Sequence, residues 1–226
     1  MHSRRARSDN YAFLLSGLLS LFLLIPILRT FPGLAGDSFL MRIGVQIGYC
    51  VLMLLGVWSM HKQTRLFRLG MILAVSTVIL TVSNIFYSIK AIELCANLAV
   101  LCFSVMSAVI AIKHVFGGTA VDRNMLFGAM CVYLLIGLIW AIVYGLIFRF
   151  WPGSFNGIEN LDGTVTFDNL LYFSFVTLVG LGYGDITPVT PLARTGAYLE
   201  VVTGHMYMTI MMAGLVSNYI SMRKVR

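Results

Sequence analysis

Charged side chains are scarce in this chain of 226 residues. They make up 11% of it, against 59% for hydrophobic residues, and the mean hydropathy is +0.89. A soluble domain typically has about 25% charged residues on a surface that must face water. The chain also lacks a long polar stretch that would form a separate soluble domain. The composition therefore predicts an integral membrane protein.

Clusters of metal-binding or catalytic side chains are also missing. The cysteines lie in apolar runs without a Cys-x-x-Cys pair or a Cys/His cluster: Cys50, Cys95, Cys102 and Cys131. Such cysteines are typically free thiols that pack as small apolar side chains. We expect neither a disulfide framework nor a zinc site, and no cofactor. Without convergent carboxylates or a nucleophile–base pair the sequence does not indicate an enzyme. Without repeated broken helices it does not indicate a secondary transporter.

What the sequence does contain is apolar stretches long enough to cross a bilayer, which takes about 20 residues per helix. Six of them lack strand-like alternation and carry few charges: 11–28, 40–60, 69–88, 94–112, 125–148 and 196–221. A seventh, at about 168–181, is too short to span and lies where a re-entrant segment would be expected. The predicted fold is an all-α membrane protein with six transmembrane helices and a re-entrant helix and loop between helices five and six.

The basic residues orient these helices. If the six helices alternate, most Lys and Arg residues lie on the side of both termini, and the positive-inside rule places that side in the cytoplasm. This topology accounts for the net charge of +7 without a nucleic-acid partner. The basic start, the first apolar run and the small residues at 33–36 are also typical of a cleaved signal. The run is long for such a signal, so we favour a retained first helix.

A glycine-rich loop follows the seventh stretch. It reads Gly180-Leu181-Gly182-Tyr183-Gly184, followed by Asp185. Glycine triplets also make turns and helix contacts, but this one lies between two spanning stretches, after a short apolar helix and before Asp-x-x-Pro. In that context it resembles the pore loop of the potassium channel superfamily, whose filter reads Thr-Val-Gly-Tyr-Gly-Asp. The resemblance covers about 124–222, and the first four helices match only in number and hydrophobicity.

The resemblance implies a filter of backbone carbonyls. In this fold, rings of carbonyls from four chains replace the water around K⁺. Here they would come from Gly180, Leu181, Gly182 and Tyr183, and glycine at 182 and 184 permits backbone angles that a Cβ penalises. K⁺ is then the permeant ion and the only metal expected.

Four side chains are predicted to support this filter: Asp185, Tyr172, Phe173 and Thr177. Asp185 would lie at the outer mouth and accept a hydrogen bond from Tyr172. Tyr183 would point away from the pore toward Tyr172 and Phe173. The pore helix is predicted to run from about Asp168, as N-cap, to Val179, with the negative end of its dipole toward the cavity.

Gly180 departs from the family pattern, which has threonine at this position. The innermost ion site would then lose its side-chain oxygens, and selectivity over sodium would be reduced. A third glycine also adds backbone freedom to the filter. On this interpretation, Gly180→Thr is expected to sharpen selectivity.

The last helix supplies a predicted hinge and cavity lining. Gly204 falls at the family's hinge position, although glycine there equally serves close packing against the pore helix. His205, Met208, Met212 and Val216 would face the pore, where a narrow apolar ring gates by dewetting. His205 is interpreted either as a neutral side chain bonded to the base of the pore helix or as a proton sensor, because histidine titrates near physiological pH.

The first four helices show no sign of a voltage sensor. The fourth stretch contains no Lys or Arg, which a sensor needs in a regular series. We therefore predict a four-helix peripheral module at 1–120 and a pore domain at 121–226. The chain is similar to small bacterial potassium-channel-like proteins with an uncharged fourth helix, which implies a bacterial plasma membrane.

One filter loop per chain implies a homotetramer in membrane lipid, with an auxiliary subunit left open. The implied function is a potassium-selective channel subunit that conducts K⁺ passively and is not steeply voltage-gated. Two alternatives stay open. One is a weakly selective cation channel, suggested by Gly180, and the other is a non-conducting membrane subunit that regulates a true channel.

Overall fold

The computed structural model describes residues 11–30, 71–80, 83, 90–117, 123–158 and 163–224, and these residues are mostly helical. The labelled elements are α1 (Tyr11–Thr30), α5 (Lys90–Gly117), α6 (Arg123–Phe150), β1 (Phe155–Asn156), α7 (Gly163–Val179), β2 (Thr187–Pro188) and α8 (Pro191–Lys224). Residues 71–80 form a further helical segment. The stretch predicted at 40–60 lies outside the described residues, and the one at 69–88 lies only partly within them.

Within the described part of the chain, three helices are long and apolar enough to cross a membrane. They are Ala91–Lys113, Arg123–Phe150 and Pro191–Ser217. The first two contain the predicted stretches at 94–112 and 125–148 and extend beyond them, because polar residues at the ends continue the helix. The third overlaps most of the stretch predicted at 196–221. The last helix begins at Pro191, earlier than predicted. Proline suits a first turn, where its missing N–H would have no intrahelical partner.

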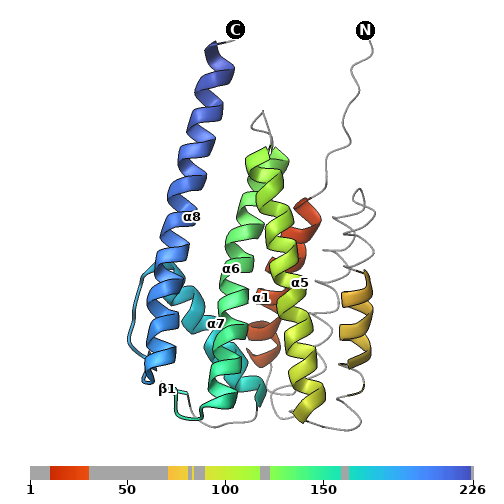
Figure 1. Ribbon diagram of the computed structural model, residues 1–226, viewed down its shortest axis with the longest axis vertical. Coiled ribbons are helices and arrows are strands. Elements are labelled where there is room, and N and C mark those ends of the chain that lie inside the picture. The colour runs from red at the N-terminus through yellow and green to blue at the C-terminus, as the bar shows by residue number, and fades with distance from the viewer. Residues whose placement is uncertain are drawn as a thin grey trace.

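Helix α6 is the centre of the bundle. It packs against α1, α5, α7 and α8, and Figure 1 shows it in green between the outer helices and α8. Leu135 and Leu138 on α6 are almost completely buried in the largest apolar cluster. Gly137 lets α7 approach closely, because an added Cβ there would lie 2.7 Å from the ring of Phe175. Since α6 holds α7 in place, it also fixes the segment that follows α7.

The start of α7 differs from the prediction. The helix begins at Gly163, so Asp168 lies inside it and the N-cap assignment of Asp168 was wrong. The first residues of α7 are glycine and β-branched residues, which are weak helix formers. Tertiary packing compensates for them, because Phe167 contacts the main apolar cluster.

Helix α7 and the segment after it run in opposite directions. Figure 1 shows α7 ending beside the middle of α8, and the chain then returning to the end at which α8 begins. Antiparallel pairing of Phe155 with Pro188 and Asn156 with Thr187 ties the returning segment to the loop after α6. The Val189 N–H also donates to the Ser154 carbonyl at 2.8 Å. The chain from Gly180 to Ile186 is therefore held at both ends.

Candidate functional site

Gly180 ends α7 through a pair of hydrogen bonds. The Leu181 N–H donates to the Val176 carbonyl and the Gly180 N–H to the Thr177 carbonyl, both at 2.9 Å. This is the Schellman pattern, which places a left-handed residue just after the helix, and Gly180 has φ +80°. A threonine would be strained at that angle. Gly180→Thr would therefore strain the backbone at the end of α7 as well as add a side-chain oxygen to the loop.

The next two glycines of the loop share this backbone region. Gly182 has φ +61° and Gly184 has φ +81°, and a Cβ added at either position would meet nothing within 4 Å. Glycine is thus required there by the backbone angle and not by lack of space. Every residue from Gly180 to Asp185, including Leu181 and Tyr183, is exposed in the single chain. The backbone of the loop is therefore accessible on the surface of the single chain.

The structure brings Tyr172 and Asp185 together. A hydrogen bond to the Asp185 carboxylate is the main reason why the pKa of Tyr172 is raised, and Tyr183 is close enough to contribute to the same shift. Phe173 is placed differently from the prediction. Its ring is buried and makes edge contacts with Tyr144 at 5.2 Å and Phe155 at 5.4 Å between centroids. Phe173 thus packs behind α7, while Tyr172 reaches the loop.

Glu200 is a fully buried carboxylic acid that joins three helices. The Tyr144 hydroxyl of α6 donates to Oε2 of Glu200 at 2.5 Å, and Ser174 of α7 contacts Oε1 at 2.5 Å. The sequence gives no signal for its partners, because they lie 56 and 26 positions away on other helices.

The protons in this cluster can be counted. The Ser174 hydroxyl also lies 2.7 Å from the Gly137 carbonyl, so one hydroxyl proton faces two oxygen acceptors. A carbonyl can only accept. Both contacts are hydrogen bonds when Glu200 carries a proton and donates it to Ser174, which donates in turn to Gly137. The cluster is then neutral, as burial of a lone carboxyl favours.

Gly204 packs against the end of α7. An added Cβ would lie 2.7 Å from both the carbonyl oxygen and the Cδ1 of Leu178. Helix α8 continues through Gly204 without interruption. The close-packing alternative is therefore what the structure shows at Gly204, while a hinge role stays a prediction.

The His205 ring lies next to Gly180, the first residue of the loop. Its Nδ1 is 2.9 Å from the Val201 carbonyl, one turn earlier on α8. A Cβ built on Gly180 would lie 3.3 Å from Cε1 and 3.8 Å from Nε2 of this ring. The imidazole thus fills the side-chain space of Gly180. The sequence alone had placed His205 in the same cavity but not against that residue.

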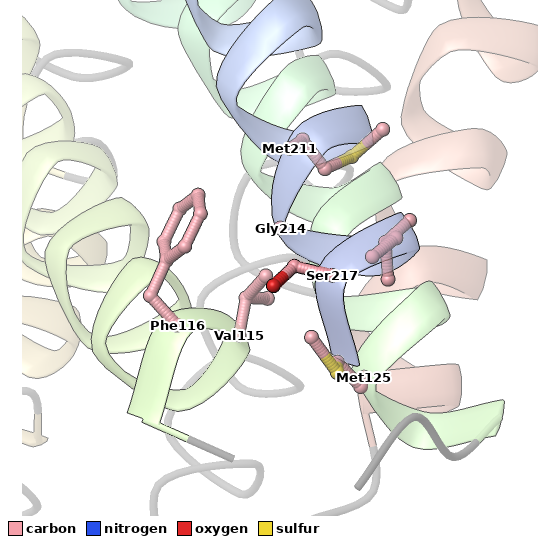
Figure 2. A pocket seen from close by; sticks show the side chains of 7 residues that line it. Val115, Phe116, Met125, Met211, Gly214 and Ser217 are labelled. Carbon is pink, nitrogen blue, oxygen red and sulfur yellow. The ribbon is translucent and has the colours of Figure 1, made fainter. Parts of the chain in front are cut away.

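The other predicted cavity residues lie on an open side of α8. Met208, Met212 and Val216 are each about half exposed in the single chain. A small pocket of about 150 Å³ lies toward the C-terminal end of α8 (Figure 2). It is lined by α5, α6 and α8 through Val115, Phe116, Met125, Met211, Gly214, Leu215 and Ser217. The pocket places α5 beside the part of α8 that carries Met212 and Val216.

The cysteines within the described residues are free thiols. Cys95 and Cys102 are exposed on α5, and Cys131 is buried on α6. Cys50 lies outside the described residues. Cys131 agrees with the prediction that the thiols pack as small side chains in apolar helices, whereas Cys95 and Cys102 do not pack within the single chain.

Comparison with known proteins identifies the region around this site. Residues 129–220 match the model of a family described as ion channel. Two pore potassium channel c of Oryza sativa subsp. japonica is 36% identical over 73 residues, which are 32% of this chain and 16% of that protein. Two-pore potassium channel 5 of Arabidopsis thaliana is 34% identical over 101 residues, which are 45% of this chain and 22% of that protein.

These matches are partial. The chain spans about a fifth of the length of these relatives, and no solved structure matches it. The family and both relatives are ion channels and not enzymes. Both relatives are plant proteins, so the similarity to small bacterial channels stays a prediction. The residues matched by the family model begin in α6 and end in α8, and they include the whole glycine loop.

Proposed function

The chain is a member of the potassium channel superfamily, and on this premise we propose that it is one subunit of a channel that conducts K⁺ passively across a membrane. One observation carries the proposal. Helix α7 ends beside the middle of α8, and a loop with three left-handed glycines then returns to the start of α8. Such a loop can present successive backbone carbonyls to an ion, as a potassium filter does.

The proposed ligands of K⁺ are the backbone carbonyls of Gly180, Leu181, Gly182 and Tyr183. Potassium channels assemble as oligomers, and rings of carbonyls need four such loops, so the proposed unit is a homotetramer. Asp185 would attract cations at the outer mouth and would be held there by Tyr172, which supports the same geometry.

The proposed membrane topology follows the sequence. Six helices would span, α7 and the loop would be re-entrant, and both termini would lie in the cytoplasm. Helix α5 covers the fourth predicted span, and its apolar part carries no series of cations. We therefore propose a channel without steep voltage dependence.

A weakly selective cation channel is the second candidate, and Gly180 favours it. The innermost position of the loop has no side-chain oxygen, so the filter has one ring of ligands fewer than the family pattern. Such a pore would still conduct, but it would distinguish K⁺ from Na⁺ less strongly.

Ion-substitution recording tests both candidates. Purified protein is placed in a planar bilayer with K⁺ on one side and Na⁺ on the other. We expect a reversal potential near the K⁺ equilibrium value. A value near zero with robust current would support the weakly selective channel. Folded protein that passes no current would contradict both and favour a non-conducting subunit.

Gly184→Ala is the matched control in this experiment. Its added methyl group meets open space, so only the backbone angle at φ +81° is disturbed. We expect the variant to fold and to lose K⁺ current or selectivity. A Gly184→Ala protein with unchanged current and selectivity would show that the ions take another path.

A further inference from the structure

Tyr144 of α6 lies at the centre of the side chains behind the glycine loop. Its ring makes edge contacts with Phe173 of α7 at 5.2 Å and with Phe155 of β1 at 5.5 Å between centroids. A Cβ added at Gly196, near the start of α8, would lie 3.0 Å from Cε1 of the same ring. One side chain therefore touches the helix before the loop, the strand that pairs with its far end, and the helix that follows it.

Hydrogen bonds with Glu200 complete this arrangement. The Tyr144 hydroxyl donates to Oε2 of Glu200 at 2.5 Å, and Oε1 lies 2.5 Å from the hydroxyl of Ser174. Ser174 lies on α7 shortly before the loop begins, and all three side chains are fully buried. The end of α7 is therefore joined to α6 and α8 by bonds that are shielded from water.

The far end of the loop reaches the same cluster. Phe155, which contacts the Tyr144 ring, is paired with Pro188 in the short sheet. Ile186 is buried in one apolar cluster with Tyr144 and Phe155. A displacement of the Tyr144 ring would therefore be transmitted to both ends of the loop.

Directional bonds add something that the apolar contacts lack. Aromatic rings can slide over one another at little cost, whereas a hydrogen bond confines its donor and acceptor to a narrow range of distance and angle. A buried polar network that is fully satisfied specifies one packing arrangement. Here the network continues from Ser174 to the Gly137 carbonyl of α6 at 2.7 Å, so it sets how α7 lies between α6 and α8.

We propose that Tyr144 and Glu200 are positioning residues for the loop, which hold both of its ends and thereby help to set the preference of the pore for K⁺ over Na⁺. The inference rests on the proposed channel function. The selectivity of a carbonyl filter depends on how its ligands are arranged, and the ends of the loop determine where the carbonyls between them can lie. The pair is separate from the bond between Tyr172 and Asp185.

Three substitutions separate the hydrogen bonds from the packing. Tyr144→Phe keeps the ring and its contacts with Phe173 and Phe155 but removes the hydroxyl. Glu200→Leu removes the acceptor, and Glu200→Gln keeps one acceptor and one donor. Phe103→Ala is the control, because Phe103 is almost completely buried on α5 and belongs to another apolar cluster.

Reversal potentials with K⁺ on one side of a planar bilayer and Na⁺ on the other give the permeability ratio. We expect this ratio to fall about fivefold in Tyr144→Phe and Glu200→Leu, the factor that one hydrogen bond contributes to an equilibrium. Glu200→Gln should restore the wild-type ratio, because its amide can bond both hydroxyls. Phe103→Ala should keep the ratio although it unfolds at a lower temperature. A ratio that simply follows the unfolding temperature across these variants would overturn the inference.

Hydrogen exchange of the full chain tests the same role without any current. The Leu181 N–H is bonded to the Val176 carbonyl before the loop, and the Val189 N–H to the Ser154 carbonyl after it. We expect peptides that contain these two amides to exchange about fivefold faster in Tyr144→Phe, since loss of one hydrogen bond makes local opening easier. Faster exchange at one end only, or at neither, would contradict a pair that holds both ends.

Failure of the inference can be told from failure of the proposed function. Wild-type protein without K⁺ current, or without preference for K⁺, would contradict the potassium-selective channel, and the exchange measurement then decides whether the pair positions the loop. A selective wild type with unchanged ratios in Tyr144→Phe and Glu200→Leu would overturn only the inference. Where Glu200→Leu does not assemble, Tyr144→Phe decides alone, because it keeps the ring in place.

Discussion

At the scale of residues, Glu200 shows how an acidic side chain is tolerated deep in an apolar bundle. Its two oxygens meet hydroxyl groups from two other helices, and the second hydroxyl continues to a backbone carbonyl. A buried polar group without such partners would cost about 1–3 kcal/mol. The proton count favours a neutral carboxyl, which glutamine can imitate.

We therefore expect Glu200→Gln and Glu200→Leu to differ. The glutamine amide can donate to Ser174 and its oxygen can accept from Tyr144, so the free energy of unfolding should change by less than about 1 kcal/mol. Leucine leaves the Tyr144 hydroxyl without its acceptor and removes one of the two partners of the Ser174 hydroxyl, so it should destabilise by about 1–3 kcal/mol. Thermal unfolding in detergent measures the difference. Equal destabilisation by both substitutions would mean that Glu200 must be ionised.

Prediction from sequence was uneven among single residues. The glycines at 182 and 184 were predicted to adopt backbone angles that a Cβ penalises, and their positive φ values agree. The bond between Tyr172 and Asp185 was also anticipated, through the family resemblance. The partners of Glu200 and the contact of His205 with Gly180 were not, because both depend on how two helices meet in space.

At the scale of elements, the contact between α7 and α8 fixes the position of the loop. Gly204 lies about 20 Å along α8 from Pro191, at about 1.5 Å per residue. There the backbone of α8 touches Leu178 near the end of α7. The close approach requires a residue without Cβ, and it determines how far α7 reaches along α8.

Gly204→Ala should therefore disturb this contact, and Gly214→Ala on the same helix is the matched control. An added methyl group at 204 would overlap the Leu178 carbonyl at 2.7 Å, whereas at 214 it would meet Phe116 at an ordinary 3.6 Å. We expect Gly204→Ala to lower stability by about 1–3 kcal/mol and Gly214→Ala to be neutral or stabilising. Thermal unfolding in detergent is the measurement.

The opposite ranking would contradict the packing role of Gly204. If Gly204→Ala were as stable as wild type but altered channel opening, the hinge interpretation would be favoured.

The position of α7 was predicted only approximately, because the length of a short helix depends on the surface it packs against. The three long helices were predicted well, because an apolar run of that length is a property of the sequence alone.

At the scale of the whole molecule, α8 has few neighbours in the single chain. In its most apolar window 11% of residues are buried, against 50% for α6. Methionines and aliphatic residues are exposed along it, including Met206, Ile210 and Met212. The loop from Gly180 to Asp185 is exposed on the same subunit. These surfaces are consistent with burial against other subunits in an oligomer.

We expect a homotetramer. Native mass measurement of the protein released from lipid should give about four times the chain mass of 25.1 kDa, because each chain supplies one filter loop and four are needed. Gly184→Ala should give the same number of chains per assembly, since its added methyl group meets no atom of its own chain. A stable dimer or monomer as the conducting species would contradict the carbonyl-ring filter.

The sequence by itself determined the membrane class, the helices of α5, α6 and α8, and the glycine loop with its resemblance to a potassium filter. These features are local, since they depend on runs of apolar residues and on backbone angles that only glycine adopts readily. Tertiary structure alone decided that α7 begins at Gly163, that Glu200 joins three helices, and that His205 fills the space beside Gly180. Each of these depends on contacts between segments that are distant in the chain.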